Sequence, residues 1–317
     1  MSSTKLIQNV ISILIMAGYN VSKRCEMRPR SFDILASNGK QLLVIKIVSQ
    51  IDSINGSIAL DLDKITRHLN ATPLIIGERA RNTPLKRGVI YIRYGINAVS
   101  PSTLYDYVIG EELPLIYVSA GGLYVDIDFN KLRILRENRS LSIGNLANQL
   151  GVSRRAVSRY ESGMMGTTLD IALKLEEIFD DTIVNPIDLF KYTPLPEEVK
   201  PASLSFGSDN NDISPQHPVN RLRSIGVNIQ ELQSAPFDAF ARFEDEIILL
   251  SCSNPHKETI TNAELVGDIS KISNTHSLCV VHGYKKEKMV GNTLMIGSDK
   301  LMDVSDGLDL LDILNLN

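Results

Sequence analysis

The stretch LGVSRRAVSRYESG, residues 150–163, combines the signals of a tight turn and of a short basic helix. Gly151 stands where a left-handed residue is needed after one helix, and Ser153 is a typical N-cap of the next. Val157 and Tyr160 predict the buried stripe of that second helix. The pattern leaves three arginines on the outer face: Arg154, Arg155 and Arg159.

The preceding segment, SIGNLANQLG over residues 142–151, predicts a helix that packs against the basic one. Ser142 is its expected N-cap, and Leu146, Ala147 and Leu150 are expected to face inward. The small Ala147 lets the following helix cross closely. Two short helices joined by a tight turn, with basic residues opening the second, predict a helix-turn-helix.

The spacing of these residues resembles the lambda-repressor/Cro class of five-helix DNA-binding domains over residues 129–190. The resemblance implies a helix-turn-helix at about 143–162, with residues 153–162 as recognition helix in the major groove. Further helices are expected at FNKLRILRENR, at LDIALKLEEIF after Thr168, and at a short closing segment, NPIDLF.

The resemblance also implies residue roles. Arg154 and Arg155 would face base edges and Arg159 would follow one turn later, because an arginine fork suits guanine O6 and N7 or a pair of phosphates. Ser153 and Ser158 would donate to phosphates or bases.

Two further positions follow from the same resemblance. Where the family often has a phosphate-binding glutamine, this chain has Ile143, so Ser142 or Asn145 is expected to take that contact. Arg136 and Glu161 match a pair that joins the first and third helices, and we expect a structural ion pair.

Charge is uneven along the 317 residues. The net charge is −4, yet residues 131–163 carry seven basic and two acidic side chains. A nucleic-acid binder needs such a local basic face rather than an overall positive charge. The alternative is that the arginines only solvate a surface helix.

Composition and cysteine usage exclude several classes. The chain is 43% hydrophobic and 22% charged, as in ordinary globular proteins. Three scattered cysteines without a CxxC pair fit a reducing, cytoplasmic compartment rather than a disulfide framework. We expect no signal peptide, because the apolar run after Asn9 has only about nine residues, and no membrane span.

The segment before the basic region predicts an α/β lobe. A helix over 3–17 is followed by strands FDILASN and QLLVIKIV with a turn at Asn38-Gly39, a helix over 59–70, strands at 73–77 and 88–94, and a helix starting at Ser100 or Ser102. Residues 193–218 are rich in Pro, Ser, Asn and Asp and predict a flexible linker; the alternative is an ordered loop.

Beyond the linker the first lobe recurs in weak form. SFDILASNGKQLLVIKI (31–47) aligns without a gap with PFDAFARFEDEIILLSC (236–252), and other segments match in the same order. A nearly constant offset favours a duplicated α/β unit. The alternative is a hydrophobic rhythm that any two α/β domains share.

The helix, the hairpin with Phe-Asp and the following lysine strand resemble the PD-(D/E)xK nuclease fold of Holliday-junction resolvases. Asp33 and Lys46 match its catalytic positions, but Val44 replaces the second carboxylate. The second lobe keeps only Asp238. One carboxylate cannot build the usual Mg²⁺ site, so we expect vestigial, inactive positions, with a turn or cap role for Asp33.

Two weaker signals stay open. The basic stretch GERARNTPLKRG (77–88) either contacts DNA backbone or is a solvated loop. His276, Cys279 and His282 lie along one predicted strand; a zinc site needs four ligands or a vacant catalytic position, so we expect no metal there.

The sequence therefore predicts two restriction-endonuclease-like α/β lobes, at 1–125 and 219–317, flanking an all-α domain at 128–192. The order resembles an archaeal family of HTH-type transcriptional regulatory proteins. We expect a homodimer that binds double-stranded DNA, with no membrane, no cofactor, no enzymatic activity, and room for an unknown effector. The alternatives are a targeted metal-dependent nuclease and an architectural DNA-binding protein.

Overall fold

The computed structural model describes residues 3–27, 30–119, 122–194, 217–255 and 257–314. Residues 195–216, the bulk of the predicted linker, lie outside this description. The chain forms two compact units. Unit 1 comprises Met1–Ser3, Val48–Asp52 and Ile75–Lys191, and unit 2 comprises Thr4–Ile47, Ser53–Leu74 and Tyr192–Asn317. The domains predicted from the sequence, 1–125, 128–192 and 219–317, divide the chain differently from these two units, and their boundaries stay predictions.

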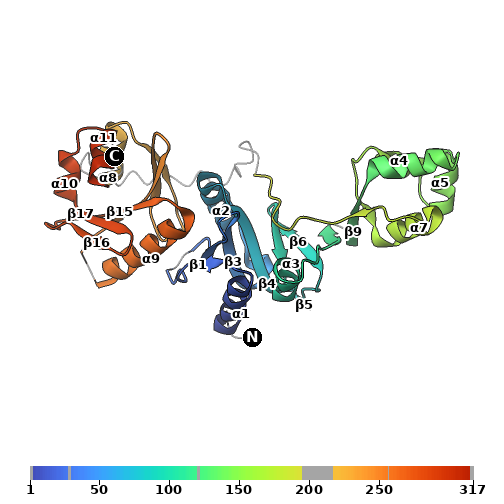
Figure 1. Cartoon of the computed structure of the whole chain (residues 1–317), viewed down its shortest axis with the longest axis horizontal. Helices are drawn as coiled ribbons and strands as arrows, with labels where there is room; N and C mark the ends of the chain where they lie inside the picture. Colours follow the sequence, from blue (N-terminus) through green and yellow to red (C-terminus); the bar gives the residue numbers. More distant parts are fainter. Residues whose placement is uncertain (1–2, 28–29, 120–121, 195–216, 256, 315–317) are drawn as a thin grey trace. The chain divides into compact units, whose positions relative to one another are not determined.

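The N-terminal part of unit 2 follows the predicted order of helix, hairpin and helix (Figure 1). Its strands pair antiparallel, β1 with β2 and β2 with β3. Asn55 caps α2 by accepting a bond from the Ile58 N–H, and Asn70 ends it in a left-handed conformation. The elements are α1 (Ser3–Met16), β1 (Asn20–Val21), β2 (Ile34–Ser37), β3 (Leu42–Gln50), a 3₁₀ turn (Ile51–Ser53) and α2 (Gly56–Leu69), of which Ser3 and Val48–Asp52 belong to unit 1.

The C-terminal part of unit 2 is a six-stranded sheet in the order β12-β13-β14-β15-β17-β16. As in the N-terminal part, an antiparallel hairpin precedes a long helix, here α9. Strand β15 is parallel to both β14 and β17. The elements are α8 (Pro218–Ser224), β12 (Asn228–Glu231), β13 (Ala239–Phe243), β14 (Glu246–Ser253), α9 (Lys257–Ser273), β15 (His276–Val281), β16 (Lys288–Val290), β17 (Thr293–Gly297), α10 (Ser298–Asp303) and α11 (Gly307–Ile313).

Direct contacts join these two parts within unit 2. The ring of His68 stacks on Phe240 with centroids 4.6 Å apart. The Ser31 hydroxyl donates to the Ser234 carbonyl at 2.8 Å, in a bond that is fully buried. The second lobe is therefore packed on first-lobe elements through both apolar and polar contacts.

Unit 1 begins with strands of the first lobe. Strand β4 is parallel to β7, and β7 pairs antiparallel with β6. Strand β8 is parallel to β6 and forms a hairpin with β9. The elements of this part are β4 (Thr72–Ala80), β5 (Thr83–Pro84), β6 (Val89–Arg93), β7 (Ile96–Val99), α3 (Pro101–Val108), β8 (Ile116–Ser119) and β9 (Gly122–Ile127). Strands β3 and β4 contribute residues to both units.

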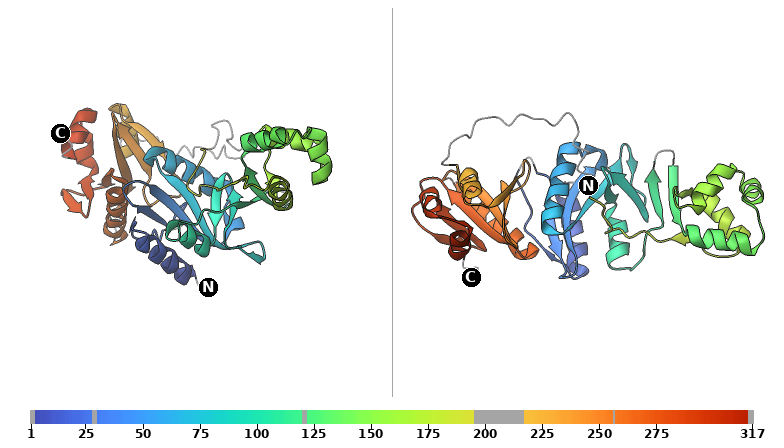
Figure 2. Two further views of the ribbon diagram at one scale, coloured as in Figure 1. Left: turned by 45° about the vertical axis from the view of Figure 1, so that its right-hand side comes forward. Right: turned by 90° about the horizontal axis from the view of Figure 1, so that it is seen from above.

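The helical part of unit 1 follows strand β9 in the chain (Figures 1 and 2). Two short strands pair antiparallel with β9: β10, between α6 and α7, and β11, which follows α7. Leu132, Leu146, Val157 and Leu175 form its fully buried centre. The elements are α4 (Phe129–Asn138), α5 (Ile143–Leu150), α6 (Arg154–Glu161), β10 (Thr167–Thr168), α7 (Leu169–Phe179) and β11 (Val184–Asn185).

The predicted fifth helix, NPIDLF, is wrong. In this described segment the chain is extended and ends in a turn, because several of its polar groups bind residues of the first lobe and not the groups of a helix. The Ile187 N–H donates to the Pro114 carbonyl, and the Asn97 amide donates to the Leu189 carbonyl. The described helical cluster thus contains α4 to α7.

Within the described ranges, no helix combines the length and apolar character needed to cross a membrane.

Candidate nucleic-acid interface

The turn between α5 and α6 has the caps that the sequence predicts. The Ser142 hydroxyl accepts from the Asn145 N–H at 3.1 Å, and Ser153 accepts from the Ala156 N–H at 3.1 Å. Gly151 between them has φ 72° and ψ 31°, the left-handed region that favours glycine. These three residues fix where α5 stops and where α6 begins.

One face of α6 is buried and the other is exposed. Val157 is fully buried and Tyr160 is 5% exposed, and both belong to the core that also contains Leu146 and Ala147. The opposite face carries exposed side chains at five positions: Ser153, Arg154, Arg155, Ser158 and Arg159. The buried and exposed faces of α6 are therefore the ones that the sequence predicts.

The three arginines of the outer face have no assigned structural partner. Among the residues that the structure describes, none of their guanidinium groups takes part in a hydrogen bond or an ion pair. Arg154 lies near another element, because a Cβ at Gly144 in α5 would come within 2.9 Å of its Nε. Arg154 thus rests over the start of α5, whereas Arg155 and Arg159 extend into solvent.

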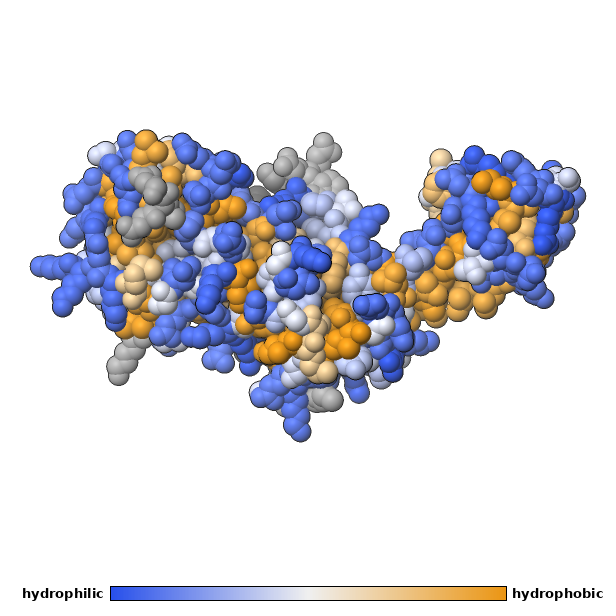
Figure 3. Space-filling model, in the orientation of Figure 1, coloured by the Kyte–Doolittle hydropathy of each residue, from blue (hydrophilic) through white to orange (hydrophobic). Residues whose placement is uncertain are grey.

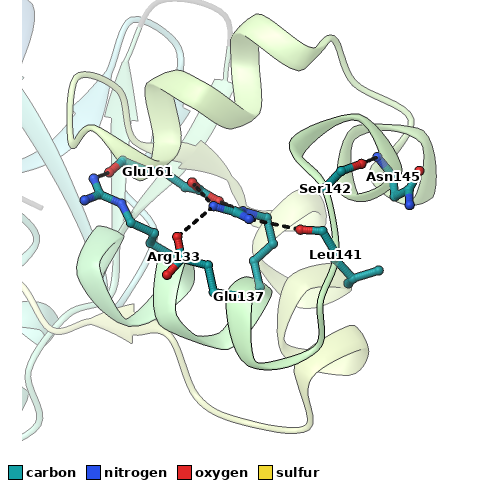
Figure 4. Close-up of polar contacts among 7 residues, drawn as sticks. Arg133, Glu137, Leu141, Ser142, Asn145 and Glu161 are labelled. Atoms are coloured by element: carbon teal, nitrogen blue, oxygen red, sulfur yellow. Dashed lines mark hydrogen bonds and ion pairs between the residues drawn. The ribbon is translucent and has the colours of Figure 1, made fainter.

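Arg136 and Glu161 form the expected ion pair between α4 and α6. The Arg136 Nε donates to Glu161 Oε1 at 2.5 Å, and Nη2 donates to Oε2 at 3.0 Å. Nη1 donates to the Leu141 carbonyl at 2.9 Å, so one guanidinium holds α4, α6 and the loop before α5. Figure 4 labels two of its partners, Glu161 and Leu141. The hydrogen bond with Glu161 raises the pKa of Arg136, which stays charged.

Sequence reasoning missed that other basic residues of the same region are structural. Arg133 donates to the Glu161 carbonyl at 2.7 Å, and Lys131 binds the Asp181 carboxylate at 2.8 Å. Arg139 donates to carbonyls at the end of α7 and lies 5.5 Å from the centroid of the Phe179 ring. Local charge density could not separate these three cations from the three on α6, because their partners are distant in sequence.

The remaining predicted positions of the interface lie at the start of α5. Ser142 and Asn145 are both exposed, and Figure 4 shows them side by side at the first turn of this helix. On the face seen in Figure 3, hydrophilic side chains cover much of the helical part of unit 1, with hydrophobic ones between them. The α5 start and the outer face of α6 thus supply polar and cationic groups at the helix-turn-helix.

The basic stretch 77–88 is only partly a free loop. It forms the end of β4, the short strand β5 and the turn before β6. Arg87 makes a bidentate ion pair with Asp106 on α3, at 2.6 Å for both bonds. That arginine has a structural partner, while Arg79, Arg81 and Lys86 are exposed.

Asp33 and Lys46, which the sequence predicts as vestigial nuclease positions, come together in unit 2. Asp33 is completely buried; its carboxylate lies 2.6 Å from Arg30 Nε and 3.7 Å from Lys46 Nζ. It also accepts from the Ile47 N–H at 2.8 Å. Asp33 therefore binds backbone and cations.

The donor set does not fit the Mg²⁺ of a nuclease. That ion takes several oxygen ligands, and here Val44 is buried where a second carboxylate is required. Over the described part of the chain, no group of three or more His, Cys, Asp or Glu side chains could hold a metal ion.

Asp238 has the same backbone environment in the second lobe. Its N–H donates to the Leu250 carbonyl and its carboxylate accepts from the Cys252 N–H, as Asp33 does with Ile45 and Ile47. Burial raises the pKa of the Asp238 carboxyl, although the Cys252 N–H opposes this. In both lobes the aspartate fastens the second strand of the hairpin to the first.

His276, Cys279 and His282 do not converge. His276 and Cys279 lie on β15 with an odd spacing, so their side chains point to opposite faces of the strand. His276 binds Glu246 at 2.9 Å, and Cys279 is buried.

Comparison with known proteins gives two family matches. Residues 3–114 match the PD-(D/E)XK superfamily domain, and residues 132–182 match a helix-turn-helix model. A protein of Methanocorpusculum labreanum is 61% identical over 314 residues, covering 99% of this chain and 98% of that protein. A protein of Methanoculleus marisnigri is 47% identical over 316 residues, covering 99% of this chain and all of its own length.

Both relatives are named "Putative HTH-type transcriptional regulatory protein". Among solved structures, a Holliday junction resolvase of Archaeoglobus fulgidus is 19% identical with a TM-score of 0.21. It covers 27% of this chain and 78% of its own.

Proposed function

Because this chain belongs to the archaeal family whose members are named HTH-type transcriptional regulatory proteins, we propose that it is a sequence-specific DNA-binding regulator with α6 in the major groove. The single observation that carries this proposal is that the cations of the helical part fall into two groups, one bound to protein groups and one exposed on α6. Four bind protein groups, whereas Arg154, Arg155 and Arg159 stand on one exposed face of α6.

The first turn of α6 supplies the direct readout. Arg155 extends from the turn that would enter the groove, and an arginine fork that donates to guanine O6 and N7 discriminates by about 1–3 kcal/mol. Arg159 is one turn further along and reads a neighbouring base or holds a phosphate. Arg154, which lies over Gly144, turns away from α5 to contact the base edges in the groove. Ser153 and Ser158 are further hydrogen-bond donors beside it.

Phosphate contacts come from the start of α5. Ser142 and Asn145 lie at the first turn, where helix N–H groups and the helix dipole favour an anion. Such contacts fix the register of a protein on the duplex without carrying sequence information. In this chain Ile143 replaces the phosphate-binding glutamine of the family, and we assign that phosphate contact to Ser142 and Asn145.

We further propose a homodimer on a palindromic site, because each chain offers one recognition helix and repressor-type domains read two half-sites about one helical turn apart. Mass photometry of the intact chain with a palindromic duplex tests this. Two chains per duplex support the dimer, and one chain per duplex at saturation removes it.

The two lobes are proposed to be a duplication without nuclease activity. The hairpin registers support common ancestry: Ile34 pairs with Ile45 as Ala239 pairs with Leu250, with Asp33 and Asp238 bound alike. The ion pairs of Asp33 with Arg30 and Lys46 support a structural role for its carboxylate. DNA cleavage with Mg²⁺ or Mn²⁺ that disappears in Asp33→Asn overturns the inactive assignment.

Selection of binding sites from random duplexes tests the proposed function. The full chain is expected to enrich one motif with two related half-sites. Arg154→Ala with Arg155→Ala is expected to enrich none, while Arg223→Ala, an exposed arginine of α8, enriches the same motif as the parent chain. If the double variant selects the same motif, α6 is not the reading element.

A further inference from the structure

A cavity of about 630 Å³ lies in unit 2 beside the vestigial nuclease positions. Its wall combines two cations with polar groups from two segments, the start of α2 and the loop between β12 and β13. They are Arg30, Lys46, Asn55, Ser57, Gln233 and Ser234. Cavities of roughly 300–1,000 Å³ hold small-molecule ligands.

The cavity wall carries more positive than negative charge. Arg30 and Lys46 share the single carboxylate of Asp33, at 2.6 and 3.7 Å. The Lys46 Nζ also donates to the Arg30 carbonyl at 2.7 Å, which fixes the ammonium at the wall. Burial lowers the pKa of Lys46, although Asp33 opposes this, so a second anion in the cavity would stabilise the charged lysine.

The start of α2 adds a second source of positive potential. Gly56 and Ser57 are the first two residues of this 14-residue helix, and such N–H groups have no acceptor within the helix. The Asn55 oxygen is occupied by the Ile58 N–H, which leaves the Asn55 amide N–H₂ and the Ser57 hydroxyl as donors at the wall. Cations, amide and hydroxyl donors together suit a phosphate group.

The second lobe closes the wall with Gln233 and Ser234, which first-lobe groups hold in place. The Ser31 N–H and hydroxyl both donate to the Ser234 carbonyl. Burial raises the pKa of Asp61 on α2, although the backbone N–H groups of Gln233 and Ser234 bind its carboxylate and oppose this. A ligand here touches both lobes at once.

We infer that this cavity binds a small phosphorylated anion, with its phosphate group against Arg30, Lys46 and the start of α2 and the rest of the ligand against Gln233. Binding joins the two lobes through one ligand. The binding step needs no DNA; only a role of the ligand as an effector rests on the proposed function.

Isothermal titration of the full chain with inorganic phosphate, pyrophosphate and adenosine monophosphate tests this inference without DNA. Saturable 1:1 binding of at least one probe below millimolar concentration is expected. Ser57→Glu places a carboxylate in the cavity at the second position of α2, where the helix dipole favours it, and is expected to weaken binding at least tenfold. Gln233→Ala is expected to weaken the nucleotide more than inorganic phosphate.

The matched control is Ser102→Glu, at the second position of α3 outside the cavity, which is expected to leave the affinity within twofold. No saturable binding of any probe, or equal affinity in Ser57→Glu and the parent chain, overturns the inference. A random 20-base-pair duplex is the other source of phosphate. If it displaces the bound probe stoichiometrically, the cavity is a DNA-backbone site and the small-anion assignment is wrong.

Discussion

Replacing Glu161 by alanine tests whether Arg136 is structural and not a DNA-reading residue. The side chains of Arg136 and Glu161 are 12% and 7% exposed, and two bonds of 2.5 and 3.0 Å join them. Removing one partner of such a buried pair costs about 3–5 kcal/mol, because the other charge is left without compensation. The Leu141 carbonyl remains as an acceptor for Arg136, which favours the lower end of that range.

Hydrogen exchange followed by mass spectrometry suits this chain, because local opening is measured without assuming that both units unfold together. At one decade per 1.4 kcal/mol, a loss of 3–5 kcal/mol accelerates amide exchange in α4 and α6 by roughly 100- to 4,000-fold, up to the limit set by global unfolding. Arg155→Ala is the matched control, because an exposed substitution stays within about 0.5 kcal/mol. If Glu161→Ala exchanges like Arg155→Ala, the assignment of Arg136 to the core of this domain is refuted.

Three further outcomes follow from the structure. Ser153→Ala removes the cap bond to Ala156 and is expected to destabilise the start of α6 by about 1 kcal/mol, which exchange of the first α6 amides would register. Gly144→Ala is expected to strengthen α5 by up to about 1 kcal/mol, because the flexible end of Arg154 gives way; faster exchange in α5 would contradict this. Burial holds the pKa of His68 below 6.5, so its unfolded form binds more protons and the free energy of unfolding should fall as pH drops through 6.5 and then through the folded pKa. In urea titrations from pH 7.5 to 5, His68→Phe is expected to flatten that slope, and an unchanged slope would assign it to another group.

Local sequence signals predicted most of the helix-turn-helix. Gly151, Ser142 and Ser153 act on their own neighbours, so a left-handed turn and two N-caps can be read without tertiary information. The spacing of Val157 and Tyr160 likewise gave the buried face of α6. These signals are short-range, and the structure has each of them where the sequence placed it.

The features that the sequence did not reveal depend on distant partners. Strands β10 and β11 are two residues long, and only their pairing with β9 defines them. The segment NPIDLF has the apolar spacing of a helix, but Tyr107 binds Asp188 at 2.6 Å and Pro114 binds Ile187, which keeps it extended. Tertiary contacts override helix propensity in such short segments.

Dependence on distant partners also explains why the charge pattern of the sequence does not identify the arginines that are exposed and, among the described residues, unpaired. Arg133 and Arg155 are both exposed arginines on short helices, yet only Arg133 donates to a protein carbonyl. Their difference depends on a residue 28 positions away, Glu161. The nuclease-like pattern indicated Asp33 and Lys46, whereas no sequence signal indicated Arg30 or the part of the cavity wall that comes from the second lobe.

The most direct test of groove reading by α6 is a thermodynamic cycle between one arginine and one guanine. On the selected site, each guanine is replaced in turn by 7-deazaguanine, which lacks the N7 acceptor, and affinities are measured for the parent chain and for the Arg154→Ala, Arg155→Ala and Arg159→Ala variants. For Arg155 and one guanine, we expect the two changes to cost about 1–3 kcal/mol each and to cost together little more than either alone. Fully additive costs for all three arginines at every guanine would contradict base reading by α6.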